Sequence, residues 1–270
     1  MTTSANVIAD SIGPAGVRIL TMELKYPRFI HAEFMTHRAF SRNASSSRAI
    51  PVRRMLAQVW SDPATPIHWG ANQPGMQADE ELPAFRKAVA RFLWKVAGRA
   101  MCVPVWLMSA LGLHKQVANR LLEPWQYIHV VVTATEWDNF FALRCHHMAQ
   151  PEIKALADAI KMAQAWSTPW ELRAGEWHLP YVNAIERDRL STEDAIKVSA
   201  ARCCRVSYVN HGGLVSTEIE DFRLYDRLMG AEPAHMSPVE HQAEAIIQPW
   251  WYANFCGWRS HRHHVETAGL

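Results

Sequence analysis

The sequence predicts a helix-rich α/β protein with few strands. Apolar residues recur at helical spacing in several segments, and only one run, Tyr127 to Thr133, has the β-branched composition typical of a strand. The composition is 49% hydrophobic and 20% charged, which is typical of a globular protein with a sizeable core and excludes a disordered or fibrous chain. We expect residues 1–270 to form a single domain.

The first half of the chain contains two predicted helices and a loop. Pro27 and the spacing that follows it predict a helix over about 26–40, and the small polar residues of 41–48 predict a loop. A long helix should begin near residue 80, and Pro104 should break or kink the chain after it. Its expected buried face consists of apolar residues three and four positions apart: Leu82, Phe85, Val89, Phe92 and Val96.

The second half predicts further helices, with start and stop signals at their ends. They are expected at about 114–122, 135–147, 152–166, 191–206 and 217–229. The segment Ser237-Pro238-Val239-Glu240 has the pattern of a capping box, with Ser237 as the N-cap and Glu240 reaching back.

Charge and cysteine content exclude several classes of protein. The formal net charge is only +2, so no general basic field indicates nucleic acid or an anionic membrane. The five cysteines lack C-x-x-C spacing, which is typical of reduced thiols, and no apolar run or leader indicates a membrane or secreted protein. Neither H-E-x-x-H nor a zinc quartet occurs, so we expect no metal site. We expect the protein in the cytoplasm, which would be the host cytoplasm if a virus encodes it.

The segment from Thr36 to Arg48 carries the strongest chemical signal. Its thirteen residues contain three arginines and four serines in a loop-forming stretch, a combination that could hold a phosphate through charge-assisted hydrogen bonds. The alternative interpretation is a solvated linker, because serine-rich loops are common.

Two further arginines lie among apolar neighbours on predicted helices. Arg120 and Arg144 must each pair with a carboxylate or face a ligand, because an unpaired charge is costly to bury. Internal salt bridges with Glu123 or Glu136 are the alternative to ligand binding.

These residues resemble the flavin-dependent thymidylate synthase (ThyX) family. The string T-H-R-A-F-S-R-N-A-S-S-S-R at 36–48 keeps six of the eight fixed positions of the family signature R-H-R-x-x-S-x-N-E-x-S-x-R. Segments 119–124 and 139–153 are similar to further family motifs. C-R-V-S-Y at 204–208 and S-P-V-E-H at 237–241 are similar to motifs that precede the signature in the family, so the motif order here looks circularly permuted.

The resemblance implies a ThyX-like fold with a small, mainly antiparallel sheet, and an enzyme that makes dTMP from dUMP. FAD would be the cofactor, NADPH and 5,10-methylenetetrahydrofolate the co-substrates, and the protein a homotetramer with shared active sites. The residues implied to bind dUMP are Glu33, Ser46, Ser47, Arg48, Arg120 and Arg144, with Arg144 also the catalytic residue that polarises the uracil. The residues implied to bind the flavin are His37, Arg38, Asn139, Ser207, His235, Ser237 and Glu240.

A second string near the C-terminus echoes the signature. Trp258-Arg259-Ser260-His261-Arg262 follows S-P-V-E-H at about the family's interval, so His261 and Arg262 are alternatives to His37 and Arg38 as flavin contacts. We prefer His37 and Arg38 because only they lead into the serine loop.

Departures from the signature leave other functions open. Thr36 and Ala44 replace a signature Arg and Glu, and Glu33 stands where the family usually has Gln, so a related enzyme could install a hydroxymethyl or aminomethyl group on dUMP or dCMP. A second rival is covalent catalysis by Cys145, whose thiol pKa a neighbouring Arg144 could lower. The third is a non-catalytic nucleotide or nucleic-acid binder that uses the basic stretch Arg38, Arg42, Arg48, Arg53 and Arg54.

Overall fold

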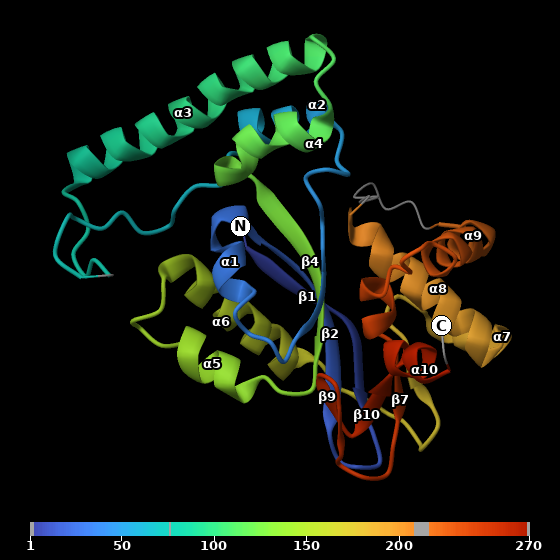
Figure 1. The fold of residues 1–270 in the computed structure, drawn as a ribbon. Coiled ribbons are helices and arrows are strands. Elements are labelled where there is room, and N and C mark those ends of the chain that lie inside the picture. The colour runs from blue at the N-terminus through green and yellow to red at the C-terminus, as the bar shows by residue number, and fades with distance from the viewer. Residues whose placement is uncertain (1–2, 76, 208–215, 269–270) are drawn as a thin grey trace.

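A computed structural model describes residues 3–75, 77–207 and 216–268. Its central sheet has five strands: β1 (Ser4–Ile12), β2 (Arg18–Pro27), β3 (Ser41–Ala44), β4 (Tyr127–Ala134) and β5 (Trp170–Glu171). The strand order is β3-β4-β2-β1-β5, and β1, β2 and β4 of this sheet are labelled in Figure 1. All neighbours pair antiparallel except β1 and β5, which are parallel. The helix-rich fold with a small, mainly antiparallel sheet is therefore confirmed.

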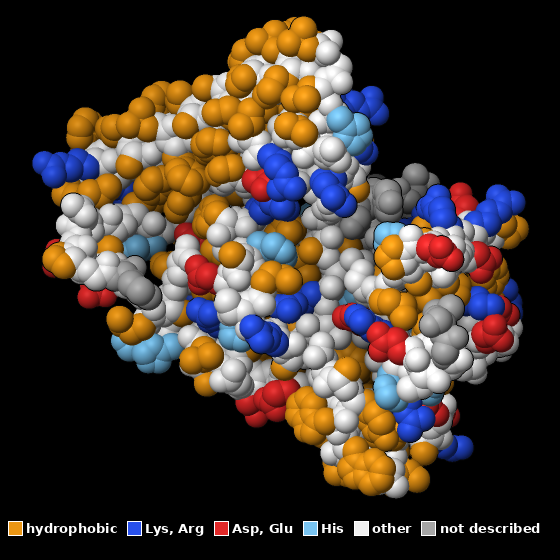
Figure 2. Space-filling view, viewed as in Figure 1, with side chains coloured by type: hydrophobic (Ala, Val, Ile, Leu, Met, Phe, Trp, Pro, Cys, Tyr) orange, Lys and Arg blue, Asp and Glu red, His pale blue; other side chains and the backbone are white. Residues whose placement is uncertain are grey.

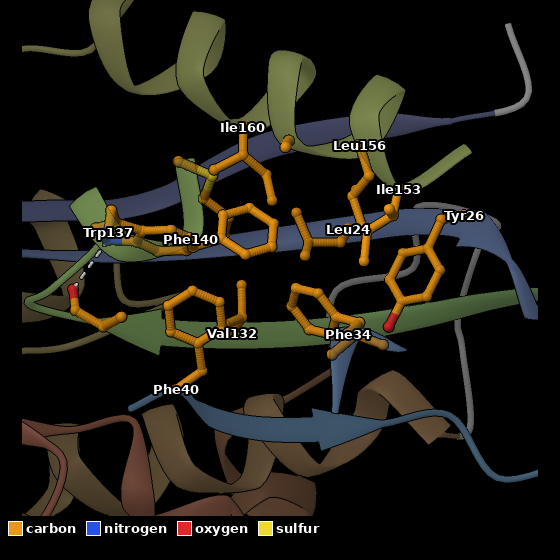
Figure 3. Packing of buried hydrophobic residues seen from close by; sticks show 14 of the residues in the cluster. Leu24, Tyr26, Phe34, Phe40, Val132, Trp137, Phe140, Ile153, Leu156 and Ile160 are labelled. Carbon is orange, nitrogen blue, oxygen red and sulfur yellow. Dashed lines mark hydrogen bonds between the residues drawn. The ribbon is translucent and has the colours of Figure 1, made fainter. Parts of the chain in front are cut away.

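One face of the sheet packs against two helices, α5 (Asp138–Arg144) and α6 (Pro151–Trp166). Alternate residues of a strand point to opposite faces, so Leu24 and Tyr26 of β2 share one face. They pack with Ile153, Leu156 and Ile160 of α6 in the main core cluster (Figure 3). Each fully buried side chain of this size stabilises the fold by about 1.5–3 kcal/mol. This core holds β2 and β4 rigidly in the centre of the molecule.

The opposite face of the sheet packs against C-terminal segments. A three-stranded sheet of order β10-β7-β6 consists of β6 (Trp177–His178), β7 (Ala243–Ala245) and β10 (Trp258–Ser260). A short hairpin consists of β8 (Trp251–Tyr252) and β9 (Phe255–Cys256). Ile19 of β2 lies in a core cluster with Ala243 and Trp258. The first and last parts of the chain are therefore joined through one apolar core.

A chain of buried hydrogen bonds crosses between these layers. Ser11 Oγ lies 2.9 Å from Nδ1 of His178, whose Nε2 lies 2.8 Å from Thr21 Oγ1. Thr21 Oγ1 is 2.7 Å from Thr133 Oγ1, which is 2.9 Å from Nδ1 of His241. Burial lowers the pKa of both histidines to about 3, so both rings are neutral.

A helical portion lies beyond one end of the sheet (Figure 1). It consists of α2 (Val52–Ser61), α3 (Ala84–Ala110), α4 (Lys115–Ala118) and the 3-10 helix η2 (Asn119–Trp125). The long helix predicted after residue 80 is confirmed, but α3 continues through Pro104 without a break. No helix among the described residues is both long and apolar enough to cross a membrane.

The predicted buried face of α3 is instead exposed. Phe85 is 80% exposed and Phe92 is 65% exposed, while α3 packs on α2 and η2 through other residues such as Cys102 and Val105. Apolar side chains consequently cover much of the visible surface of α3 (Figure 2). Helical periodicity therefore predicted the position of α3 correctly but its buried face wrongly. Other apolar residues of α3 make the buried contacts.

The C-terminal helices lie on the other side of the sheet from α5 and α6 (Figure 1). They are α7 (Ala184–Arg189), α8 (Thr192–Cys204), η3 (Arg205–Ser207), α9 (Glu218–Met229), η4 (Ser237–Glu240) and α10 (His261–Thr267). Ser191 and Thr217 cap α8 and α9 by accepting backbone N–H bonds, as their sequence positions predict. Buried Asp221 binds Arg202 at 2.9 Å and Arg205 at 3.0 Å, which ties α9 to α8 and η3.

The region predicted as a helix over 26–40 is mostly not helical. β2 runs to Pro27, and only η1 (Arg28–Ile30) and α1 (His31–Phe34) follow. The predicted loop at 41–48 begins with β3, which pairs with β4. β1 and most of β2 had no sequence prediction. Sheet pairing, which joins residues far apart in sequence, outweighed the local periodicity that favoured a helix.

The predicted capping box at Ser237 is also wrong. Met236 is the N-cap of η4, and no side chain caps this helix. Glu240 forms an ion pair with Arg262 instead of reaching back to the helix start. The Ser237 hydroxyl is therefore not used as a cap.

Candidate functional site

A cavity of about 680 Å³ lies between the loop after β3 and the C-terminal helices. Four of the sequence-predicted site residues line it: Ser46 and Arg48 from the signature segment, and His235 and Ser237 from the C-terminal motif. They are separated by about 190 positions in the chain. The fold thus brings together residues predicted to bind nucleotide and residues predicted to bind flavin.

The serine loop is held in place by buried hydrogen bonds. Ser45 pairs with the backbone of His129, with its N–H 2.8 Å from the His129 carbonyl and its hydroxyl accepting from the His129 N–H at 3.1 Å. Buried Asn119 donates from Nδ2 to the carbonyl oxygens of Ser47 at 2.7 Å and Ile50 at 2.9 Å. The segment is therefore an ordered wall of the cavity, and the alternative of a solvated linker is wrong.

Cations dominate the lining of this cavity. Arg48, Lys115 and Arg227 contribute to it, and no carboxylate among the described residues does. Lys115 is fixed by donating from Nζ to the Ala49 carbonyl at 2.8 Å, whereas no described carboxylate lies within ion-pair distance of Arg48 or Arg227. Uncompensated arginines beside serine hydroxyls form a favourable site for an anion such as a phosphate. Neither Lys115 nor Arg227 was predicted as a site residue from the sequence.

Ser47 and Arg120 lie in a neighbouring ion-pair cluster, outside the lining of the cavity. Ser47 is buried and donates to Glu123 Oε1 at 2.9 Å. The same carboxylate lies 3.1 Å from Arg28 and 3.8 Å from Arg120, whose side chain is largely exposed. The salt bridge between Arg120 and Glu123 that the sequence left as an alternative is confirmed.

A second group of predicted residues surrounds Arg144 at the end of α5. Arg144 donates from Nε to Nε2 of His37 at 3.0 Å, and its guanidinium lies 3.7 Å from Glu33 and 3.4 Å from Thr36 Oγ1. The alternative partner Glu136 bonds to the backbone N–H of Asp138 instead. Glu33, His37 and Arg144, which the sequence assigned to two ligands, are therefore in one cluster.

His37 is neutral in this cluster. Burial, the Arg144 charge and the Arg42 charge together lower its pKa to about 4. Because Nε2 accepts from Arg144, the ring proton is on Nδ1, which meets no acceptor within the described part of the chain. His37 therefore has one hydrogen-bond donor available for a ligand.

Arg42 connects this cluster with the C-terminal motif. It lies on β3 and donates to the Phe34 carbonyl at 3.0 Å. Its charge contributes to the lowering of the His37 pKa, and the Glu240 charge acts to raise the pKa of Arg42 itself. Glu240 in turn pairs with Arg262. The signature contains Arg42 between two fixed positions, so its inward placement on β3 could have been inferred only from the strand that the sequence prediction missed.

The remaining predicted flavin residues are less enclosed. Arg38 and Asn139 are exposed, and Ser207 ends η3 with its side chain outside the described residues. His261 bonds to Tyr225 at 2.8 Å, and Arg262 pairs with Glu240 and Glu266. The signature-like segment 258–262 thus places Arg262 in an ion pair with Glu240.

Cys145 lacks the environment of an activated thiol. Burial and a hydrogen bond to Asp158 raise its pKa, which is the opposite of the lowering expected from a neighbouring Arg144. Arg144 directs its guanidinium toward His37 and Glu33 instead. Among the described residues, no three His, Cys, Asp or Glu side chains come together as metal ligands.

A family model and solved structures match parts of this chain. The family model "Thymidylate synthase complementing protein" matches residues 16–169. Among solved structures, a UMP/dUMP methylase PolB from Streptomyces cacaoi bound with 5-Br UMP superposes with a TM-score of 0.51 and 14% identity, over 60% of this chain and 88% of that chain. The same methylase bound with 5-Br dUMP gives a TM-score of 0.45 and 19% identity, over 55% and 67% of the chains. No curated protein matches the chain.

The structural likeness shows a shared fold, and the family match identifies the relationship. The matched residues include the signature segment, Arg120 and Arg144, whereas the motifs at 204–208 and 237–241 lie beyond it. Because this match covers more than half of the chain, the protein belongs to the thymidylate synthase complementing protein family, the ThyX family that the signature predicts.

Proposed function

We propose that the protein transfers a one-carbon unit from 5,10-methylenetetrahydrofolate to C5 of dUMP and so makes dTMP. The observation that carries this proposal is the cationic cavity in which Ser46 and Arg48 meet His235 and Ser237. Its volume lies within the usual range of small-molecule sites, and the family and fold comparisons support a pyrimidine nucleotide as substrate.

FAD fits the residues present as the cofactor. His37 offers an available Nδ1–H, and the unused Ser237 hydroxyl and the cations around it can hold polar groups and phosphates. When bound, reduced FAD supplies hydride, and NADPH is the proposed reductant. His37, Arg38, Asn139, Ser207, His235, Ser237 and Glu240 would hold it.

The chain's own cations bind and polarise the substrate in this proposal. Arg48 and the Ser46 hydroxyl hold the 5′-phosphate, and Arg144 stabilises negative charge that develops on the uracil ring. Arg144 keeps its orientation through neutral His37 and through Glu33. Ser47 and Arg120 contribute indirectly, since their contacts with Glu123 hold the loop that carries Arg48.

A homotetramer with shared active sites completes the proposal. Arg144 and Arg48 belong to groups at opposite ends of β3 within one chain, so a second copy would supply Arg144 to a given cavity. The exposed apolar face of α3 supports such an assembly, because large exposed apolar patches mark protein–protein contacts. We propose the cytoplasm as its location.

Permuted motif order within one domain is also part of the proposal. The C-terminal motif packs beside the signature, because η4 contacts β3 and Asn43 donates to the Cys203 carbonyl at 2.8 Å. Proximity in space is what a permutation of a single domain requires.

A different one-carbon product is the second candidate function. Thr36, which replaces the signature Arg, contacts Arg144 directly, and Ala44, which replaces the signature Glu, lines the cavity. Thr36 therefore lies next to the arginine proposed to act on the uracil, and Ala44 lies in the cavity proposed to hold the 5′-phosphate. This candidate would place a hydroxymethyl or aminomethyl group on dUMP or dCMP.

One experiment tests these functions together. The purified protein is examined by absorbance for flavin, titrated with dUMP, and incubated with NADPH, methylenetetrahydrofolate and either dUMP or dCMP. A flavin spectrum that dUMP perturbs, with dTMP as the product by mass spectrometry, is the expected result. Another modified nucleotide would favour the second candidate, and a colourless protein that does not bind added FAD would contradict both.

A further inference from the structure

A second cavity adjoins the first one. It has a volume of about 350 Å³ and shares Leu224 and Arg227 of α9 with the larger cavity. Arg205, Glu220 and Arg223 complete its lining. Both volumes are in the range of small-molecule sites, so a single extended small ligand could occupy the two cavities.

The second cavity is cationic because of the spacing of arginines on α9. Arg223 and Arg227 are four residues apart, so both are on one face of the helix, about 6 Å apart along its axis. Arg205 joins them from η3 and is oriented by its 3.0 Å bond to buried Asp221. This arrangement presents three guanidinium groups to one small volume.

Among the described residues, Glu220 is the one carboxylate that lines the two cavities, and it is already engaged, while Asp221 pairs with Arg205. Glu220 caps the start of α9 by accepting from the backbone N–H of Thr217 at 3.0 Å, which contributes to the lowering of its pKa. The two cavities together are lined by Arg48, Lys115, Arg205, Arg223 and Arg227 against Glu220. A ligand that carries several negative charges would complement this surface.

We propose that the second cavity binds the outer phosphates of a pyrimidine nucleoside triphosphate whose nucleoside end occupies the larger cavity. This inference rests on the proposed function, which places the 5′-phosphate beside Arg48. A phosphate chain suits the site because planar guanidinium groups bind phosphate oxygens in pairs. A nucleoside triphosphate bound in this way would compete with dUMP and inhibit turnover.

Arg223 provides the sharpest test because it lines the second cavity but not the first. Calorimetric titrations with dUMP and dUTP, without divalent cations, compare the wild type with Arg223→Ala. We expect the wild type to bind dUTP about tenfold more tightly than dUMP, and Arg223→Ala to remove most of this difference without changing the affinity for dUMP. Arg223→Lys should restore part of the difference, because it keeps the charge but not the bidentate geometry.

A control variant removes the same charge elsewhere. Arg86 is exposed on α3 and lines neither of these cavities, so Arg86→Ala should leave both affinities unchanged. Equal affinity of the wild type for dUMP and dUTP would overturn the inference. The same conclusion would follow if Arg86→Ala and Arg223→Ala had equal effects.

Binding of tripolyphosphate, measured alongside binding of dUMP, distinguishes failure of this inference from failure of the proposed function. If dUMP binds and is converted but tripolyphosphate does not bind, the inference fails and the function stands. If tripolyphosphate binds in an Arg223-dependent manner but dUMP does not bind, the proposed function fails and the anion cavity stands. Tighter binding of a triglutamate peptide than of tripolyphosphate would show that the cavity prefers carboxylates, and would overturn the assignment to phosphates.

Discussion

Arg144 and His37, 107 positions apart in the chain, are joined by a 3.0 Å hydrogen bond from the guanidinium Nε to the imidazole Nε2. The bond requires an unprotonated Nε2, and the low pKa of His37 keeps it so. A positive side chain is thus held in position by a neutral partner. The Glu33 carboxylate lies 3.7 Å from the guanidinium, within ion-pair distance, so Arg144 has one acidic partner besides the neutral histidine.

Replacing Arg144 should separate catalysis from cofactor binding. Arg144→Ala removes the cation proposed to polarise the uracil, and we expect at least a 100-fold loss of turnover, roughly the cost of one transition-state donor, with flavin still bound. The pKa of His37 should rise above its value of about 4 because one of the charges that lower it is gone. Activity assays, absorbance and an NMR titration of His37 check these effects. Full activity in Arg144→Ala would refute the catalytic role.

Ser237 should affect ligand binding without affecting stability. Its hydroxyl does not cap η4 and the residue lines the cavity, so Ser237→Ala should weaken FAD binding and leave the melting temperature unchanged. Ser191 is the matched control, since it caps α8, and Ser191→Ala should lower stability by about 1 kcal/mol without affecting FAD. Flavin titration and thermal melts distinguish the two. A stability loss in Ser237→Ala equal to that of Ser191→Ala would contradict the assignment.

Cys145→Ser should be nearly silent. The thiol is only partly exposed, its pKa is raised, and no proposed step uses it. We expect turnover close to that of the wild type and a stability change within about 1 kcal/mol. A loss of turnover together with a covalent nucleotide adduct in the wild type, detected by mass spectrometry, would instead favour cysteine catalysis.

Acid should destabilise the fold through its buried histidines. His178 and His241 have pKa values near 3 in the folded state and about 6.5 when unfolded, so between these values the unfolded chain binds more protons. The free energy of unfolding should therefore fall as the pH falls from 6.5 toward 3, by about 1.4 kcal/mol per pH unit for each histidine. Urea titrations across this range measure the slope. His241→Gln should reduce it, whereas replacing exposed His147 with Gln should not.

Charges placed on α3 should disrupt the proposed assembly without unfolding the chain. Phe92 and Trp106 are exposed on α3, so Phe92→Glu and Trp106→Glu should cost little folding energy but prevent apolar contact between copies. Light scattering should show a shift from tetramer to smaller species. Ile185→Glu on α7, another exposed apolar site, is the control. A wild-type protein that is monomeric at all concentrations would refute the role of this face.

Local sequence signals predicted most of the helices, but not the five-stranded sheet against which they pack. Pro151 marked the start of α6, and Ser191 and Thr217 marked α8 and α9, because caps and first-turn residues act locally. β1 and most of β2 escaped prediction: β2 pairs with β4, 100 or more positions away in the chain, and β1 forms a hairpin with β2. Because β3 was predicted as a loop, the position of Arg42 near His37 and Glu240 could not be foreseen.

In the candidate site, too, some residues were identified from the sequence and others only from the structure. The resemblance identified Ser46, Arg48, His235 and Ser237, which the fold brings to one cavity. It offered no signal for Arg227, whose role depends on how α9 packs against the serine loop. The resemblance assigned Arg120 and Ser47 to the ligand, with a salt bridge from Arg120 to Glu123 as the alternative, and the structure shows both residues in contact with Glu123.

The buried chain from Ser11 to His241 couples the two ends of the protein through proton positions. Each hydroxyl has one proton to donate, so if Nδ1 of His178 carries the ring proton, Thr21 must donate to Nε2 of His178 and Thr133 must donate to Thr21. Nδ1 of His241 must then donate to Thr133. The tautomer of His178 on β6 thus dictates the tautomer of His241, which directly follows Glu240. A change in the tautomer of His178 therefore changes which ring nitrogen of His241, beside η4, carries the proton, without any movement of the backbone.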